Sequence, residues 1–132
     1  MKFHLTIATC LAALVLPAIA DDTELGKKMD ELNDHYKSIR REEDPAKGAV
    51  SAREAQKLIA ASLDMEPAML ASVKGPAKEN ALAMYRQLMG ESYVLLCKIE
   101  QAYLAKDMDK AAALYAELKE LRKQGHDKFI EE

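Results

Sequence analysis

The sequence predicts an all-α protein, an antiparallel up-down-up-down four-helix bundle, and three observations support this. Apolar residues recur at alternating steps of three and four in four separate segments, as on one face of a helix. The composition favours helix formers such as Ala, Leu, Lys, Glu and Met, and Trp is absent. Two of the links between the segments are short and the third is moderate, which lets consecutive helices pack antiparallel.

The first twenty residues are expected to be a secretory signal peptide that takes no part in the fold. Lys2 gives a basic start, an apolar run follows over residues 5–16, and Ala18-Ile19-Ala20 is a small-residue cleavage site. The run is too short to span a bilayer, so no membrane anchor is expected. Cys10 allows a lipoprotein alternative, but Thr9 precedes it and apolar residues continue after it. Export to the periplasm is therefore predicted.

The mature chain, residues 21–132, is expected to form one domain with a single core. Removing Lys2 with the leader changes the formal charge from −3 to −4, since no acid leaves with it. This mild acidity argues against nucleic acid and anionic membranes as partners. Cys97 is then the only cysteine, so no internal disulfide can form, and we interpret it as a small buried hydrophobe.

The first helix is expected over about residues 23–41, with Asp22 or Thr23 as its cap. Asp44-Pro45 and Gly48 then indicate a turn. A helix that reaches about residue 64 is expected to begin at a capping box, Ser51-Ala52-Arg53-Glu54. The core stripe of the first helix contains Leu25, Met29, Leu32, Tyr36 and Ile39.

An irregular link follows, bracketed by Pro67 and Gly75-Pro76. The third and longest helix is expected over about residues 77–105, and its wide apolar stripe predicts contact with two neighbours. Lys106-Asp107 allows only a tight turn, with Asp107 as the expected cap of a fourth helix over about residues 108–131. The core stripe of that helix contains Leu114, Leu118, Leu121, Gly125 and Phe129.

Met29 and His126 are the two residues that suggest a function. Each is expected roughly 8–10 Å from the same end of the bundle, at a rise of about 1.5 Å per residue. A thioether facing an imidazole is an axial ligand pair for haem iron in electron-transfer proteins. Taken singly, Met29 is explained as core filler, and His126 as a surface residue near a helix C-terminus. Their matched heights weaken these simpler explanations.

Two segments near the ends of the mature chain are distinctive, Lys28-Met29-Asp30-Glu31-Leu32-Asn33-Asp34 and Leu118-Lys119-Glu120-Leu121-Arg122-Lys123-Gln124-Gly125-His126-Asp127-Lys128. With them the mature chain resembles the soluble cytochrome b562 family over its whole length, but the resemblance is specific only at the two ends. The middle helices depart from the family in sequence and loop length. The resemblance implies one non-covalent haem b per chain, with Met29 and His126 as iron ligands and Arg122 near the ring. It also implies pocket walls at Leu32, Tyr85 and Met89, the last two by a looser alignment.

Two details near the predicted ligand bear on how a haem would be held. A covalent c-type attachment needs Cys-x-x-Cys-His, whereas the four residues before His126 run from Arg122 to Gly125 and include no cysteine. Gly125 costs a helix about 1 kcal/mol relative to Ala. It either lets a flat ring approach the backbone or reflects fraying at the helix end, and the sequence leaves both open.

The predicted function is a periplasmic b-type cytochrome that transfers single electrons to or from a redox partner protein. It is expected to be a monomer. It is not expected to be an enzyme, because two axial ligands leave the iron no open position. One alternative is a haem-free periplasmic bundle with a binding or stress-response role. Another is Cu(I) binding by thioethers, although packing explains most of these methionines better. The methionines concerned are Met65, Met69, Met84, Met89 and Met108.

Overall fold

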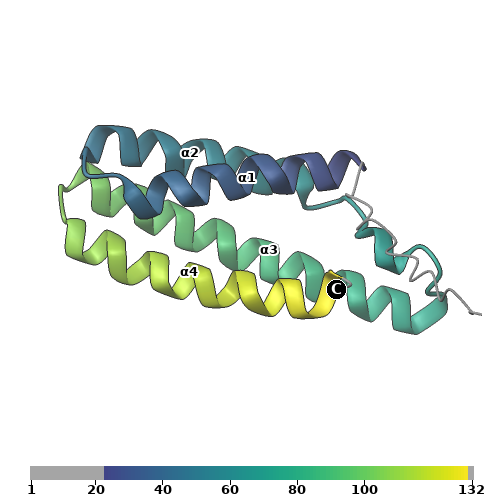
Figure 1. Ribbon diagram of the computed structural model, residues 1–132. Helices are drawn as coiled ribbons and strands as arrows, with labels where there is room; N and C mark the ends of the chain where they lie inside the picture. The colour runs from purple at the N-terminus through teal and green to yellow at the C-terminus, as the bar shows by residue number, and fades with distance from the viewer. Residues whose placement is uncertain (1–22, 131–132) are drawn as a thin grey trace, which may run out of the picture.

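The computed structural model describes residues 23–130, which form four long α-helices and one short 3₁₀ turn, with no strand among them (Figure 1). The predicted signal peptide lies outside the described residues. No helix in the described part is long and apolar enough to cross a membrane. The elements are α1 (Glu24–Arg41), α2 (Pro45–Ser62), η1 (Ala68–Leu70), α3 (Gly75–Leu104) and α4 (Met108–Phe129).

The helices run alternately up and down and lie side by side, which confirms the predicted bundle (Figure 1). Contacts are most numerous between α2 and α3, and α3 also packs closely on α4. The helices α1 and α4 make far fewer contacts with each other than the other neighbouring pairs do. The bundle is therefore tightly joined along three seams and loosely joined along the fourth.

The first helix begins and ends as expected. The Thr23 side chain caps α1 by accepting a hydrogen bond from the Gly26 backbone N–H at 3.0 Å. This satisfies one of the backbone donors that every helix leaves free at its start. Leu25, Leu32 and Ile39 are buried along the predicted stripe, so the periodicity of three and four identified the core face of α1.

The predicted start of the second helix is wrong. The helix α2 begins at Pro45, not at the Ser51 capping box, because Asp44 is its N-cap and accepts hydrogen bonds from the Ala46 and Lys47 N–H groups. Proline suits the first position of a helix, where its missing N–H costs nothing. The same Asp-Pro pair is common in turns, and for this reason the sequence alone predicts a turn here.

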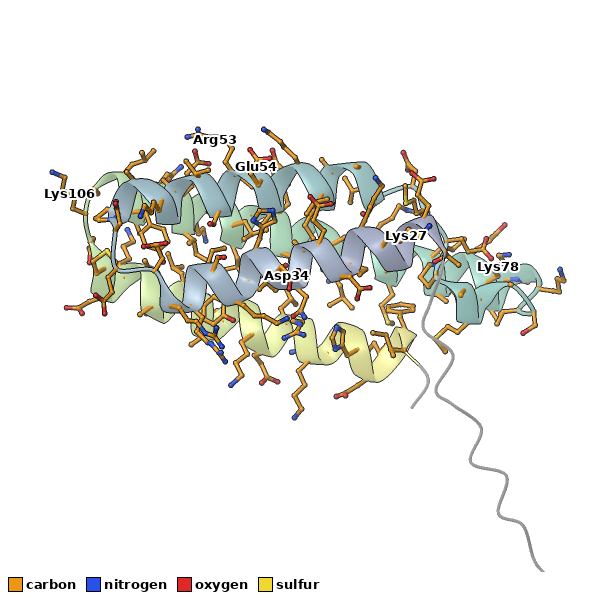
Figure 2. All side chains as sticks on the ribbon, turned by 45° about the horizontal axis from the view of Figure 1, so that its top comes forward. Lys27, Asp34, Arg53, Glu54, Lys78 and Lys106 are labelled. Carbon is orange, nitrogen blue, oxygen red and sulfur yellow. The ribbon has the colours of Figure 1, made fainter. Side chains whose placement is uncertain are left out.

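The seam between α2 and α3 is held by polar contacts as well as by packing. The Arg53 guanidinium donates to Glu100 at 2.6 Å, and the Gln56 amide donates to the second oxygen of the same carboxylate at 2.7 Å. Burial alone would raise the pKa of Glu100, but the hydrogen bonds from Gln56 and Arg53 lower it below its usual range. Figure 2 shows Arg53 on the outer side of α2, so this cluster closes the seam at its rim.

The third helix begins at Gly75, slightly before the predicted position, and its first turns extend beyond the rest of the bundle (Figure 1). Gly75 has a φ of +63°, a left-handed conformation that glycine adopts without strain. Asp107 caps α4 as predicted, since its carboxylate accepts from the Lys110 N–H at 3.0 Å.

The two ends of the bundle differ in what they contain. We call one the turn end, where the short links 42–44 and 105–107 lie, and the other the terminal end, where α1 starts and α4 finishes (Figure 1). The longer link 63–74 also lies at the terminal end. Figure 2 marks the turn end by Lys106 and the terminal end by Lys27.

One core runs through the bundle and contains most of the residues of the predicted stripes. Met29, Leu114 and Phe129 pack against it from partly buried positions. Its buried apolar members are Leu25, Leu32, Tyr36, Ile39, Ala49, Ala52, Ala55, Ile59, Tyr85, Met89, Leu96, Ile99, Ala102, Tyr103, Ala111 and Leu118.

Candidate functional site

Met29 and His126 both belong to the terminal end of the bundle. Met29 lies in the second turn of α1, which starts at Glu24, and His126 lies in the last turn of α4, which finishes at Phe129. The start of α1 and the end of α4 are at the same end of the molecule (Figure 1). The thioether of Met29 is half-buried against the core. The arrangement agrees with the matched heights expected from the helix lengths; their pairing on one iron stays a prediction.

His126 is exposed at the surface of α4, but its surroundings still affect its charge. Partial burial of the imidazole lowers the pKa of His126, the nearby Arg122 guanidinium lowers it further, and Asp127 opposes both. The imidazole is therefore mainly neutral at pH 7, since its ordinary pKa is already about 6.5. Neutral imidazole has the free nitrogen lone pair that a metal ligand needs.

Arg122 acts electrostatically on residues of both helices of the loose seam. It lies four residues before His126 on α4, is half-buried, and acts electrostatically on His126 and also on Tyr36 of α1. Burial raises the pKa of the Tyr36 phenol, and the Arg122 guanidinium opposes that rise. Tyr36 was predicted only as a core residue. Its spacing of seven from Met29 was the one signal that it would lie on the same face of α1 as the predicted ligand.

The three predicted pocket walls are all buried. Leu32, Tyr85 and Met89 belong to the core against which Met29 packs. The Tyr85 hydroxyl donates to the Ser62 carbonyl at 2.7 Å, and burial raises the pKa of Tyr85 to about 12, so the phenol remains a donor at neutral pH. The interior beside Met29 is therefore apolar, apart from a phenol whose hydroxyl is already bonded. Such a lining suits the faces of a porphyrin.

Gly125 lies on the core stripe of α4, next to His126, and is half-buried. A Cβ placed on it would meet no atom within 4 Å, apart from the helix backbone itself. A half-buried position on a core stripe normally has close neighbours, because protein interiors pack densely. Space is therefore left open beside the predicted imidazole ligand, on the side that faces the bundle.

These observations together fit a haem better than a bare metal ion. Within residues 23–130, no group of three or more His, Cys, Asp or Glu side chains could hold an ion. A haem needs only two protein ligands because the porphyrin supplies four nitrogens. The two ligands would be the half-buried thioether on α1 and the neutral imidazole on α4. The open space at Gly125 and the loose α1–α4 seam would leave room for the ring.

Two surface hollows lie elsewhere and contain none of the predicted haem-site residues. The larger, of about 650 Å³, is a groove along α3 and α4 whose lining includes Gly90, Val94 and Leu121. The smaller, of about 190 Å³, lies at the turn end beside Ile39 and Tyr103. The groove is wide open to solvent.

The methionines considered for copper have other roles. Met89 is buried in the core, Met65 and Met108 pack against it, and the sulfur of Met84 accepts from the Lys128 ammonium at 3.1 Å. The packing interpretation therefore holds for most of them. Cys97 is half-buried, and burial together with the nearby Glu100 raises the pKa of its thiol. A raised thiol pKa makes Cys97 a poor nucleophile at neutral pH.

Comparison with known protein families shows which family the chain belongs to. The family model described as cytochrome b562 matches residues 24–129, which spans α1 to α4. The chain belongs to the cytochrome b562 family. No significant match is found among curated proteins or among solved structures. The cytochrome b562 family implies haem binding and electron transfer rather than enzymatic catalysis, and its four-helix bundle agrees with the fold seen here.

Proposed function

We propose that this member of the family is a periplasmic b-type cytochrome that binds one non-covalent haem through Met29 and His126 and carries single electrons. The observation that supports it most is that the family match covers both helices that bear the two donors, and these donors lie at the same end of the bundle. No Cys-x-x-Cys-His motif precedes His126, so the haem would be held without thioether bonds.

When bound, the haem supplies a single iron centre that alternates between the ferric and ferrous states. The Met29 thioether favours the ferrous state and so raises the reduction potential. The His126 imidazole would donate a nitrogen lone pair of its neutral form to the iron. Arg122, close to His126, places a positive charge near the site and disfavours the more positive ferric centre. If Met29 and His126 both bind the iron, neither oxygen binding nor substrate chemistry would be expected.

The surroundings of the site suit a carrier that meets its partners briefly. His126 is exposed, so an edge of a ring bound to it would lie near solvent. Electron-transfer partners typically bind through small, transient contacts at such an edge. We propose a monomer that exchanges electrons with a periplasmic redox protein, after removal of the predicted signal peptide at residues 1–20.

The experiment is a titration of the purified mature protein with haemin, followed by a spectrum of the reduced complex. We expect stoichiometric binding and the sharp bands of a six-coordinate low-spin haem. His126→Ala should weaken binding by about a hundredfold or more and remove those bands, as expected when a metal–ligand bond is lost. His35→Ala is the matched control, since it removes an imidazole on α1 outside the predicted site.

Two outcomes would contradict the proposal. One is a wild-type protein that shows no low-spin bands with excess haemin. The other is a His126→Ala variant with the same bands as the wild type. A melting temperature that haem leaves unchanged would instead favour the haem-free bundle, because a ligand bound only by the native state must raise it.

A further inference from the structure

The turn of α4 that carries His126 is the last of the helix. Phe129 is the final helical residue, and the Ile130 backbone N–H closes the helix by donating to the His126 carbonyl at 3.0 Å. Terminal turns open readily because few tertiary contacts hold them. A ligand placed there needs something that fixes the turn to the rest of the bundle.

Phe129 makes the contact that holds this turn. Its ring is half-buried and meets Tyr85 of α3 edge to face, with ring centroids 5.7 Å apart and an interplanar angle of 83°. This is a favoured arrangement for two aromatic rings. A second contact between the same segments, from the Lys128 ammonium to the Met84 sulfur, is exposed and involves a weak acceptor.

Tyr85 is itself fixed in place. It is buried, and its hydroxyl donates to the Ser62 carbonyl at the end of α2. The chain of contacts therefore runs from Ser62 through Tyr85 to Phe129, and joins the end of α4 to two other helices. Phe129 and His126 are three residues apart, so they lie on adjoining faces of the same turn. Movement of the phenyl ring would therefore displace the turn that carries the imidazole.

We propose that Phe129 is a positioning residue for His126. Held edge-on by Tyr85, its ring keeps the last turn of α4 ordered and directs the imidazole toward the iron. This inference rests on the proposed haem ligation and adds to it a residue that need not touch the iron. It also assigns a role to Tyr85 beyond that of a pocket wall.

The test is a double-mutant cycle on haem affinity. Phe129→Ala should lower haemin affinity by about tenfold, whereas in the His126→Ala background the same change should have almost no effect, because its influence passes through the imidazole. Phe129→Tyr keeps the ring and should retain affinity. Lys128→Ala is the matched control, since it removes the exposed contact of the same turn. Should Phe129→Ala fail to fold, Phe129→Leu keeps the apolar volume and replaces it.

A second measurement does not depend on haem. In the haem-free protein, the Ile130 amide should exchange with solvent about tenfold faster in Phe129→Ala than in the wild type, because that amide is bonded to the His126 carbonyl. Unchanged exchange would overturn the inference. So would an equal loss of affinity with and without His126, which would make Phe129 a simple pocket wall.

The two proposals fail differently. A wild-type protein that binds no haem defeats the proposed function, and with it the positioning of a haem ligand. A wild-type protein that binds haem normally, beside a Phe129→Ala variant that binds equally well, defeats only the role of Phe129.

Discussion

Each end of the bundle has a tyrosine of α3 and a glycine, and the two ends use them differently. At the turn end, the buried Tyr103 ring lies against Gly48, and its hydroxyl donates to the Ile39 carbonyl at 2.8 Å. At the terminal end, Tyr85 is bonded in a similar way, but a Cβ on Gly125 would meet no atom within 4 Å.

The two glycines differ in the space that surrounds them. Beside Gly48 the space is filled, since a Cβ there would overlap the Tyr103 ring. Glycine is required there so that a helix can approach an aromatic ring closely. At the terminal end the glycine has no such neighbour, and α1 and α4 are loosely joined. We therefore expect changes at the turn end to affect folding, and changes at the terminal end to affect haem binding.

The largest expected effect is the difference between the two glycine positions in the free energy of unfolding of the haem-free protein. Gly48→Leu should lower the free energy of unfolding by about 3 kcal/mol, because the new side chain must displace the anchored Tyr103 ring. Gly125→Leu should change it by less than about 1 kcal/mol, because open space receives the side chain and leucine favours helix. Chemical denaturation of both variants measures the difference. Equal losses would remove the distinction between the ends.

The next effect concerns haemin affinity, for which Gly125 should matter more than Gly48. Gly125→Leu should lower haemin affinity by about tenfold, or about 1.4 kcal/mol, because its side chain would occupy the space beside His126. Gly48→Ala, a milder change at the turn end, should leave the affinity of the folded protein unchanged. Haemin titration of both variants decides this. Full affinity in Gly125→Leu would mean that the space is not used by the ring.

A third test uses pH, because iron and the proton compete for the same nitrogen of His126. The pKa of His126 is lowered in the folded protein, so its imidazole takes up a proton less readily than a free imidazole. Protonation should therefore weaken haem binding by less than about tenfold between pH 7 and pH 5.5. In the haem-free protein the unfolded chain takes up the proton first. Stability should therefore rise slightly as pH increases from below the folded pKa to the unfolded one.

The control for this pH test is His126→Ala, in which residual haem binding should lose that part of the pH dependence. Binding in the wild type that strengthens as pH falls over the same range would contradict the assignment of His126 as a ligand.

The smallest effect compares the two tyrosine hydroxyls. The Ile39 carbonyl lies in the last turn of α1, where helical partners are lacking, so Tyr103→Phe should cost about 1 kcal/mol of stability. The Ser62 carbonyl also accepts from the Met65 N–H at 3.1 Å, so Tyr85→Phe should cost about half as much. Thermal unfolding of the haem-free variants can resolve the two. A larger loss at Tyr85 would show that the terminal end depends on its hydroxyl more than we infer.

Most of the fold could be predicted because its signals are local. The stripe that includes Leu25, Leu32 and Ile39 identifies a buried helix face, and Asp107 is an N-cap by its position before an apolar stretch. The start of α2 was missed because its local signal is ambiguous. Asp44-Pro45 suits both a turn and a helix N-terminus, and only the hydrogen bonds of Asp44 distinguish them.

The candidate site could be predicted only in part. Helix lengths are enough to place Met29 and His126 at one end, because rise per residue is constant. How each helix is rotated about its axis depends on packing against its neighbours, which no short segment encodes. The proximity of Arg122 to Tyr36 and the contact of Phe129 with Tyr85 depend on those rotations. The sequence therefore predicted the proposed ligands but not the contacts that support them.

The central claim is that Met29 and His126 bind one iron, and the most direct test is the proton NMR spectrum of the reduced, haem-loaded protein. A methionine bound to ferrous low-spin haem lies over the ring, whose current shifts its methyl signal far upfield of all other methyl signals. We expect one such signal in the wild type and in Met89→Leu, and none in Met29→Leu. An upfield methyl signal that persists in Met29→Leu, or that is missing from the wild type, would contradict the account.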